Sequence, residues 1–86
     1  MKDVIQISHL KFAEERGLEK TYCPSEVARE LFKKDWRDNM DLVRKVADKL
    51  VKSGDLLVLQ KGEIKSGLPS KLKGPIRLRK KRDNAI

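Results

Sequence analysis

The sequence of 86 residues has few of the side chains that support metal, redox or covalent chemistry. It contains one cysteine, Cys23, and one histidine, His9. A lone cysteine cannot form a disulfide within the chain, and one Cys with one His cannot supply the three or four ligands of a zinc site. We therefore expect no bound metal and, by default, a location in the reducing cytoplasm.

Motifs of nucleotide-binding and hydrolytic enzymes are also missing. There is no glycine-rich phosphate loop, dinucleotide fingerprint or catalytic triad. The adjacent Glu14 and Glu15 fall on one predicted helix and point apart, so they cannot flank a substrate. No apolar run reaches the length of a membrane span, and no signal-peptide pattern opens the chain. We expect a protein that is not an enzyme, uses no cofactor or small-molecule substrate, and does not bind membranes.

Positive charge is abundant and unevenly placed. Residues 1–59 hold 12 Lys and Arg against 11 Asp and Glu, a balance of +1. Residues 60–86 hold 9 against 2, a balance of +7. A localised basic surface indicates a polyanionic partner, usually nucleic acid. The competing interpretation is a solvated, solubilising tail, and we favour the polyanion site.

The clearest element is an amphipathic helix predicted over residues 40–54. Its apolar positions recur at helical spacing: Met40, Val43, Val46, Ala47 and Leu50. Its other side is charged, and Asp41 and Asp48 each precede a lysine by four residues, the order that supports a helix. Gly54 is a suitable residue to end it.

A first helix is predicted over residues 3–16. Asp3 is its expected N-cap, and Gly17 fits a left-handed helix end. His9 is interpreted as a surface residue of this helix.

A second helix is predicted over residues 24–34. Pro24 suits the first helical position, and Glu26 stands where a capping carboxylate belongs. Cys23 at its start is interpreted as a small cap residue rather than a nucleophile, because the sequence offers it no second cysteine or nearby base.

Residues 33–39 join the second and third helices in one of two ways. Trp36 is in register with Met40, so the third helix could begin at Trp36. Alternatively a turn intervenes and Asp38 caps the third helix. In both cases we expect Trp36 to pack between helices rather than to stack on a base.

Extended segments complete the pattern. Residues 20–22 are expected to make a single bridge to a sheet. Residues 56–60 and 76–79 are predicted strands, joined by a basic loop at 61–74 with a short strand at 63–65. The order of elements predicts an α+β fold: a winged helix-turn-helix of three helices with a small antiparallel hairpin as its wing. One such domain over residues 1–82 is expected, followed by a frayed tail at 83–86.

The chain also resembles a family of small bacterial domains of unknown function that adopt a winged-helix fold. The matching residues are Lys20-Thr21-Tyr22-Cys23-Pro24-Ser25-Glu26-Val27-Ala28, Trp36-Arg37, Met40, Val43-Arg44, Ala47, Leu50, Gly54, Gln60-Lys61-Gly62 and Gly74-Pro75-Ile76-Arg77-Leu78. They cover most of the chain after Lys20, except residues 63–73. The resemblance implies the winged-helix fold and supplies no activity.

Two groups of basic residues are candidates for nucleic-acid binding. In a helix-turn-helix the second helix enters the major groove, which would turn Arg37, Arg44 and Lys45 toward bases. Against this, Asp38, Asp41 and Asp48 would repel phosphates, and a merely solvated face is an equal alternative. The wing and the following strand supply the better polyanion site: Lys61, Lys65, Lys71, Lys73, Arg77, Arg79 and Lys80, with Lys81 and Arg82 beyond them.

We therefore predict a nucleic-acid-binding module, possibly regulating transcription, whose partner is duplex DNA held mostly through phosphates. Structured RNA is an alternative partner, because charge alone does not separate the two polyanions. The alternative function is a protein-interaction or structural module that keeps the fold without binding DNA. No spare apolar helix is evident from the sequence, so a monomer is expected.

Overall fold

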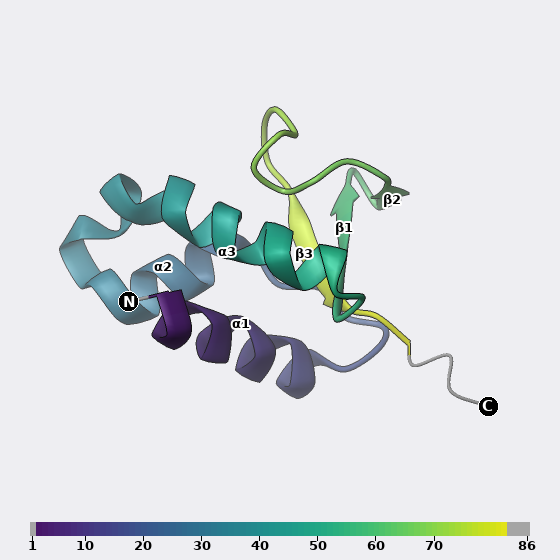
Figure 1. Ribbon diagram of the computed structural model, residues 1–86, viewed down its shortest axis with the longest axis horizontal. Helices are drawn as coiled ribbons and strands as arrows, with labels where there is room; N and C mark the ends of the chain where they lie inside the picture. The colour runs from purple at the N-terminus through teal and green to yellow at the C-terminus, as the bar shows by residue number, and fades with distance from the viewer. Residues whose placement is uncertain (1, 83–86) are drawn as a thin grey trace.

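Helices gather toward one end of the computed structural model and a small sheet lies at the other (Figure 1). The structure describes residues 2–82. Its elements are α1 (Lys2–Arg16), α2 (Pro24–Phe32), the 3-10 helix η1 (Lys33–Asn39), α3 (Met40–Lys52), β1 (Leu56–Gln60), β2 (Glu63–Lys65) and β3 (Arg77–Lys80). The strands form one antiparallel sheet in the order β2-β1-β3. The chain thus has an α+β fold with a small antiparallel sheet. The tail predicted at 83–86 lies outside the described residues.

Helix α3 buries the apolar stripe that the sequence predicts. Val43, Val46, Ala47 and Leu50 are all buried in the core. The helix ends at Lys52, and Gly54 follows with a φ of 86°. This left-handed conformation lets the N–H of Asp55 reach back to the carbonyl of Leu50 at 2.9 Å. Glycine adopts it without the steric cost of a Cβ, which explains the stop.

Helix α1 begins one residue before the predicted start. Asp3 therefore lies within its first turn, and the prediction that Asp3 is the N-cap is wrong. A carboxylate there still favours the positive end of the helix dipole. At the other end, Gly17 has a φ of 79° and its N–H donates to the carbonyl of Ala13 at 2.9 Å, as expected for a left-handed helix end.

Glu26 joins the end of α1 to the start of α2. Its carboxylate accepts the backbone N–H of Cys23 at 2.8 Å, which confirms the predicted cap. It also accepts the guanidinium of Arg16 at 2.5 Å. The hydrogen bond from Arg16 is the main reason that the pKa of Glu26 is lowered. Both charges are partly exposed, so this ion pair chiefly fixes geometry.

The segment after α2 follows neither of the two predicted arrangements. Lys33 adopts a φ of 51°, which ends α2 at Phe32, and the chain continues as the 3-10 helix η1. Helix α3 therefore begins at Met40 rather than Trp36, and the residue before it is Asn39 rather than Asp38. Trp36 does pack against the core, as expected.

His9 is buried, and the prediction of a surface position is wrong. Its Nε2 lies 2.9 Å from the carbonyl oxygen of Val43, and its Nδ1 lies 2.9 Å from the hydroxyl of Tyr22. Because a carbonyl only accepts, Nε2 carries the proton and Nδ1 accepts from Tyr22. Burial lowers the pKa of His9. This neutral imidazole connects α1 to α3 and to the segment that precedes α2.

The sheet matches the predicted extended segments closely. Strands β1 and β2 are joined by Lys61 and Gly62, both at positive φ, which suits a two-residue hairpin turn. Strand β3 begins at Arg77, one residue later than predicted, and pairs with β1. The expected single bridge is present, since Tyr22 and Leu78 exchange backbone hydrogen bonds at 2.8 Å in both directions.

The lowered pKa of His9 predicts a stability that falls at mildly acidic pH. The unfolded chain takes up a proton at the ordinary histidine pKa of 6.5, whereas the folded protein keeps His9 neutral to lower pH. Because the unfolded state then binds more protons, the free energy of unfolding should fall between about pH 7 and about pH 5.5, by at most about 1.4 kcal/mol per pH unit. Urea unfolding at several pH values measures this slope.

The control is His9→Gln, which removes the only histidine and should flatten the slope in this window. Glu26 and Glu30 have pKa values lowered from 4.5, so their contributions are lost at more acidic pH. A slope that persists unchanged in His9→Gln would show that another group causes it.

Candidate functional site

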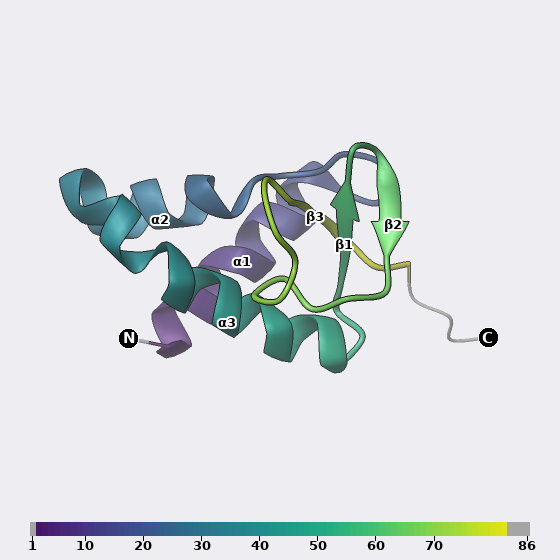
Figure 2. The same cartoon turned by 90° about the horizontal axis from the view of Figure 1, so that it is seen from above.

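The loop between β2 and β3, residues 66–76, is attached to α3 by two charged side chains. The carboxylate of Asp48 accepts the backbone N–H of Ser70 at 2.8 Å and also its hydroxyl. The guanidinium of Arg44 donates to the carbonyls of Leu72 at 3.2 Å and Gly74 at 2.9 Å. Figure 2 shows the loop passing over α3. This loop, which we call the β2–β3 loop, is therefore held in one position.

Apolar contacts and the sheet also hold the β2–β3 loop. Pro69 is fully buried, and Leu72 packs against the core. At its far end, the side-chain amide of Gln60 on β1 donates to the carbonyl of Lys73 at 2.7 Å. A loop fixed at several points can present its exposed lysines in a constant arrangement, which costs less entropy on binding.

The first basic hollow, which we call the sheet hollow, lies between the β2–β3 loop and the sheet. Its volume is about 450 Å³, and it is lined by Gln60, Lys61, Glu63, Lys65, Lys73, Pro75 and Arg77. Four cations thus face one carboxylate. Glu63 lies 4.0 Å from the ammonium of Lys65, but both are exposed and this contact is weak. The hollow carries a net positive charge suited to phosphate groups.

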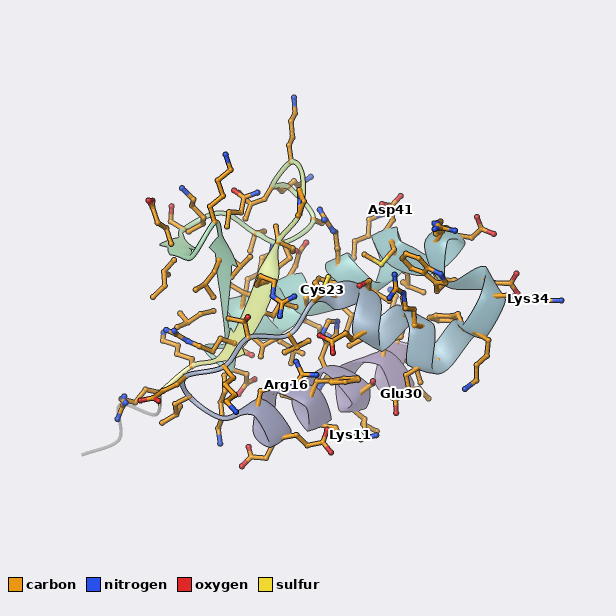
Figure 3. The ribbon with its side chains drawn as sticks, turned by 180° about the vertical axis from the view of Figure 1, so that it is seen from behind. Lys11, Arg16, Cys23, Glu30, Lys34 and Asp41 are labelled. Atoms are coloured by element: carbon orange, nitrogen blue, oxygen red, sulfur yellow. The ribbon has the colours of Figure 1, made fainter. Side chains whose placement is uncertain are left out.

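A second hollow, the α3 hollow, lies on the other side of the β2–β3 loop. Its volume is about 410 Å³, and it is lined by Met40, Asp41, Arg44, Lys45, Ser70 and Lys71. Lys45 and Lys71 are exposed, whereas Arg44 is half-buried and engaged with the loop. Asp41 is exposed on the same side of α3 (Figure 3), so this hollow is less positive than the sheet hollow.

The structure brings four of the predicted wing residues together in the sheet hollow and places a fifth, Lys71, in the α3 hollow with Arg44 and Lys45. Lys61, Lys65, Lys73 and Arg77 share the sheet hollow. Arg77 is also anchored, because its guanidinium donates to the hydroxyl and carbonyl of Thr21 at 3.0 and 3.3 Å. A fixed guanidinium can still offer its remaining N–H groups to a phosphate.

Two predicted residues of β3 lie away from the hollows. Lys80 is at the end of β3, where its ammonium is 2.6 Å from the carboxylate of Glu14 on α1. Arg79 is half-buried, and its Nε is enclosed without a hydrogen-bond partner among the described residues. Neither side chain lines the sheet hollow or the α3 hollow.

Arg37 and Arg44, predicted to read bases, are both engaged within the protein. The guanidinium of Arg37 lies 4.7 Å from the ring centroid of Trp36, and that of Arg29 lies 4.4 Å from it. Such cation–π contacts hold these groups beside the ring. Arg44 holds the β2–β3 loop. Of the three, Arg44 is half-buried, Arg37 is exposed beside the Trp36 ring on η1, and Lys45 is an exposed cation of α3.

Sequence reasoning missed Gln60, Ser70 and Asp48 as residues that shape the site. Asp48 was expected to pair along its own helix and to repel phosphates, but its carboxylate binds Ser70, 22 residues away. Gln60 ends a predicted strand and belongs to the matching residues Gln60-Lys61-Gly62, but nothing local indicates its bond to Lys73. These roles depend on contacts between distant segments, which periodicity does not reveal.

Comparison with known proteins places the chain in an uncharacterised group. A family model described as a protein of unknown function, DUF3253, matches residues 2–81. A search of curated proteins found no match. Within residues 2–82, no helix is long and apolar enough to cross a membrane, and no group of three His, Cys, Asp or Glu is placed to hold a metal ion.

The attachment of the β2–β3 loop predicts a specific stability effect. Asp48→Ala removes the acceptor for two hydrogen bonds from partly buried Ser70 and should lower the free energy of unfolding by about 1–2 kcal/mol. Urea unfolding measures this loss. Lys45→Ala, at an exposed position on the same helix, should change it by less than about 0.5 kcal/mol. Equal effects of the two substitutions would contradict the assigned role of Asp48.

Proposed function

The chain belongs to the DUF3253 family, whose function is unknown, and from that premise we propose a nucleic-acid-binding module with a winged-helix fold. The fold assignment is supported by the order of α1, α2 and α3, with a hairpin and a returning strand after the last helix. In this assignment α2 and α3 are the helix-turn-helix, η1 is an extended turn between them, and the β2–β3 loop belongs to the wing.

The sheet hollow is the observation that carries the proposal. Four cations line it against a single carboxylate, and the loop that contributes Lys73 is fixed to α3. Clustered cations raise the local potential and attract a polyanion, and each phosphate that they neutralise releases counterions. Lys45 and Lys71 of the α3 hollow extend the positive charge to the other side of the loop.

We expect the module to hold duplex DNA mainly through phosphates rather than bases. Base reading from α3 needs free guanidinium groups, but Arg44 is engaged with two loop carbonyls. Lysines supply point charges on flexible stems, which suit phosphates at varied positions and carry little sequence information. Binding should therefore depend strongly on salt and weakly on sequence. The proposal assigns the chain no catalytic step.

A protein-interaction module without DNA binding is the second candidate. The engagement of Arg44 and the exposure of Asp41 on the same side of α3 favour it, because both reduce what α3 offers to DNA. The two functions differ in one measurable respect. A module of the second kind does not bind a random duplex at low salt.

Charge reversal in the sheet hollow tests the first candidate. The triple variant Lys61→Glu, Lys65→Glu, Lys73→Glu leaves the anchored Arg77 in place. In the wild type, about four phosphate contacts give log affinity a slope of about −4 against log salt concentration. The variant should bind at least about tenfold more weakly and with a flatter slope. Fluorescence anisotropy of a labelled random duplex, repeated across salt concentrations, measures both quantities.

The matched control is Lys20→Glu, Lys34→Glu, Lys52→Glu, which changes the net charge equally at exposed positions outside both hollows. It should bind closer to the wild type at every salt concentration. Equal loss in the two triple variants would show that net charge alone, rather than the sheet hollow, attracts DNA. A labelled RNA hairpin in the same titration tests the alternative polyanion.

A further inference from the structure

Helix α1 exposes apolar side chains along its outer side. Val4 is 47% exposed, Ile7 67% and Leu10 38%, whereas Ile5 and Ala13 on the inner side are buried. Figure 1 shows α1 along the lower edge of the molecule, on the side away from the β2–β3 loop. Single exposed apolar residues are ordinary, but three that recur at steps of three on one helix form a continuous patch.

The patch is symmetric about Ile7. At 3.6 residues per turn, Val4 and Leu10 lie about 60° to either side of Ile7, and Asp3 and Lys11 lie about 40° to either side. When two copies of such a helix pack antiparallel about a two-fold axis at Ile7, position n lies level with position 14 − n of the other copy. Ile7 then meets its own copy. Asp3 lies level with the partner's Lys11 and Val4 with the partner's Leu10, each pair diagonally across the contact, and the Asp3–Lys11 pair lies nearer the contact line.

The charges on this side of α1 complement each other in the same arrangement. Asp3 is exposed on the first turn of the helix. The ammonium of Lys11 lies 2.7 Å from a carboxylate oxygen of Glu30 on α2, with the Lys11 side chain 52% exposed (Figure 3). An ammonium has three donors, so Lys11 can hold Glu30 and also receive a carboxylate from another copy. In this arrangement an acidic side chain of each copy lies level with a basic side chain of the other, so the pairing brings opposite charges together at these positions.

We propose that α1 is a homodimerisation surface, on which a second copy of this chain packs its own α1 antiparallel about Ile7. A surface that is complementary to itself is what a two-fold interface requires. A contact between single helices buries less area than a standard interface, so the dimer forms at high micromolar rather than nanomolar concentration. The proposal does not depend on nucleic-acid binding.

Sedimentation equilibrium of the full chain, from low micromolar to millimolar concentration, tests the proposal. The wild type is expected to shift from the monomer mass toward twice that mass. Ile7→Asp places two carboxylates against each other at the symmetry axis and should raise the dimer dissociation constant at least about tenfold. Because Ile7 points away from the core, this variant should keep the melting temperature of the wild type.

The matched control is Ile64→Asp, which changes an isoleucine that is 56% exposed on β2. It should dimerise like the wild type. A monomer mass at all concentrations, or equal effects of Ile7→Asp and Ile64→Asp, would overturn the assignment to α1.

Cross-linking tests the arrangement about Ile7 independently. In a Cys23→Ser background, which keeps a good cap residue, Ile7→Cys places two thiols at the two-fold axis. Mild oxidation should give a disulfide-linked dimer. Lys34→Cys, a control at another exposed position, on η1, should stay mostly monomeric. Cross-linking of both variants at the same rate would show random collision and would contradict the proposed axis.

Discussion

The pair of hydrogen bonds made by the buried His9 determines how the two halves of the molecule meet. Its imidazole bonds α1 to the carbonyl of Val43 on α3 and to the hydroxyl of Tyr22. Tyr22 is in turn paired through its backbone with Leu78 on β3. A buried imidazole is tolerated only when both nitrogens are satisfied, so this arrangement permits little variation. The position of β3, and with it Arg77 in the sheet hollow, follows from that constraint.

Two charged residues of α3 also stabilise the fold, because their side chains are bound to the β2–β3 loop. Arg44 donates to two carbonyls of the β2–β3 loop, and Asp48 accepts an N–H and a hydroxyl from it. The loop backbone thereby gains partners that water would otherwise supply. Because the Arg44 guanidinium holds the loop and its lysines in place, it is not free to hydrogen-bond a base. This is why the proposed binding relies on phosphate contacts.

Local periodicity predicted the elements well, and contacts between distant segments were not predictable. The stripe of α3, the stop at Gly54 and the strand β1 each depend on residues a few positions apart, which the sequence displays directly. His9 was misplaced because its burial depends on Tyr22 and Val43, 13 and 34 positions away. The sequence could predict that the basic residues of the hairpin lie together, since a hairpin brings its two flanks side by side. These residues are Lys61, Lys65, Lys73 and Arg77. The hydrogen bonds of Arg44 could not be predicted, because their carbonyl acceptors, 28 and 30 residues away, leave no signal in the sequence.

The two proposals together restrict how the protein could bind DNA. Helix α1 and the β2–β3 loop lie on opposite sides of the molecule (Figure 1), so a dimer joined through α1 directs its two sheet hollows away from each other. A dimer that reads neighbouring half-sites must direct both binding surfaces toward one duplex. Opposed hollows instead suit two separate segments of nucleic acid. Since phosphate contacts carry little sequence information, the two proposals together lead to an assembly that would bridge two nucleic-acid segments rather than select a palindromic site.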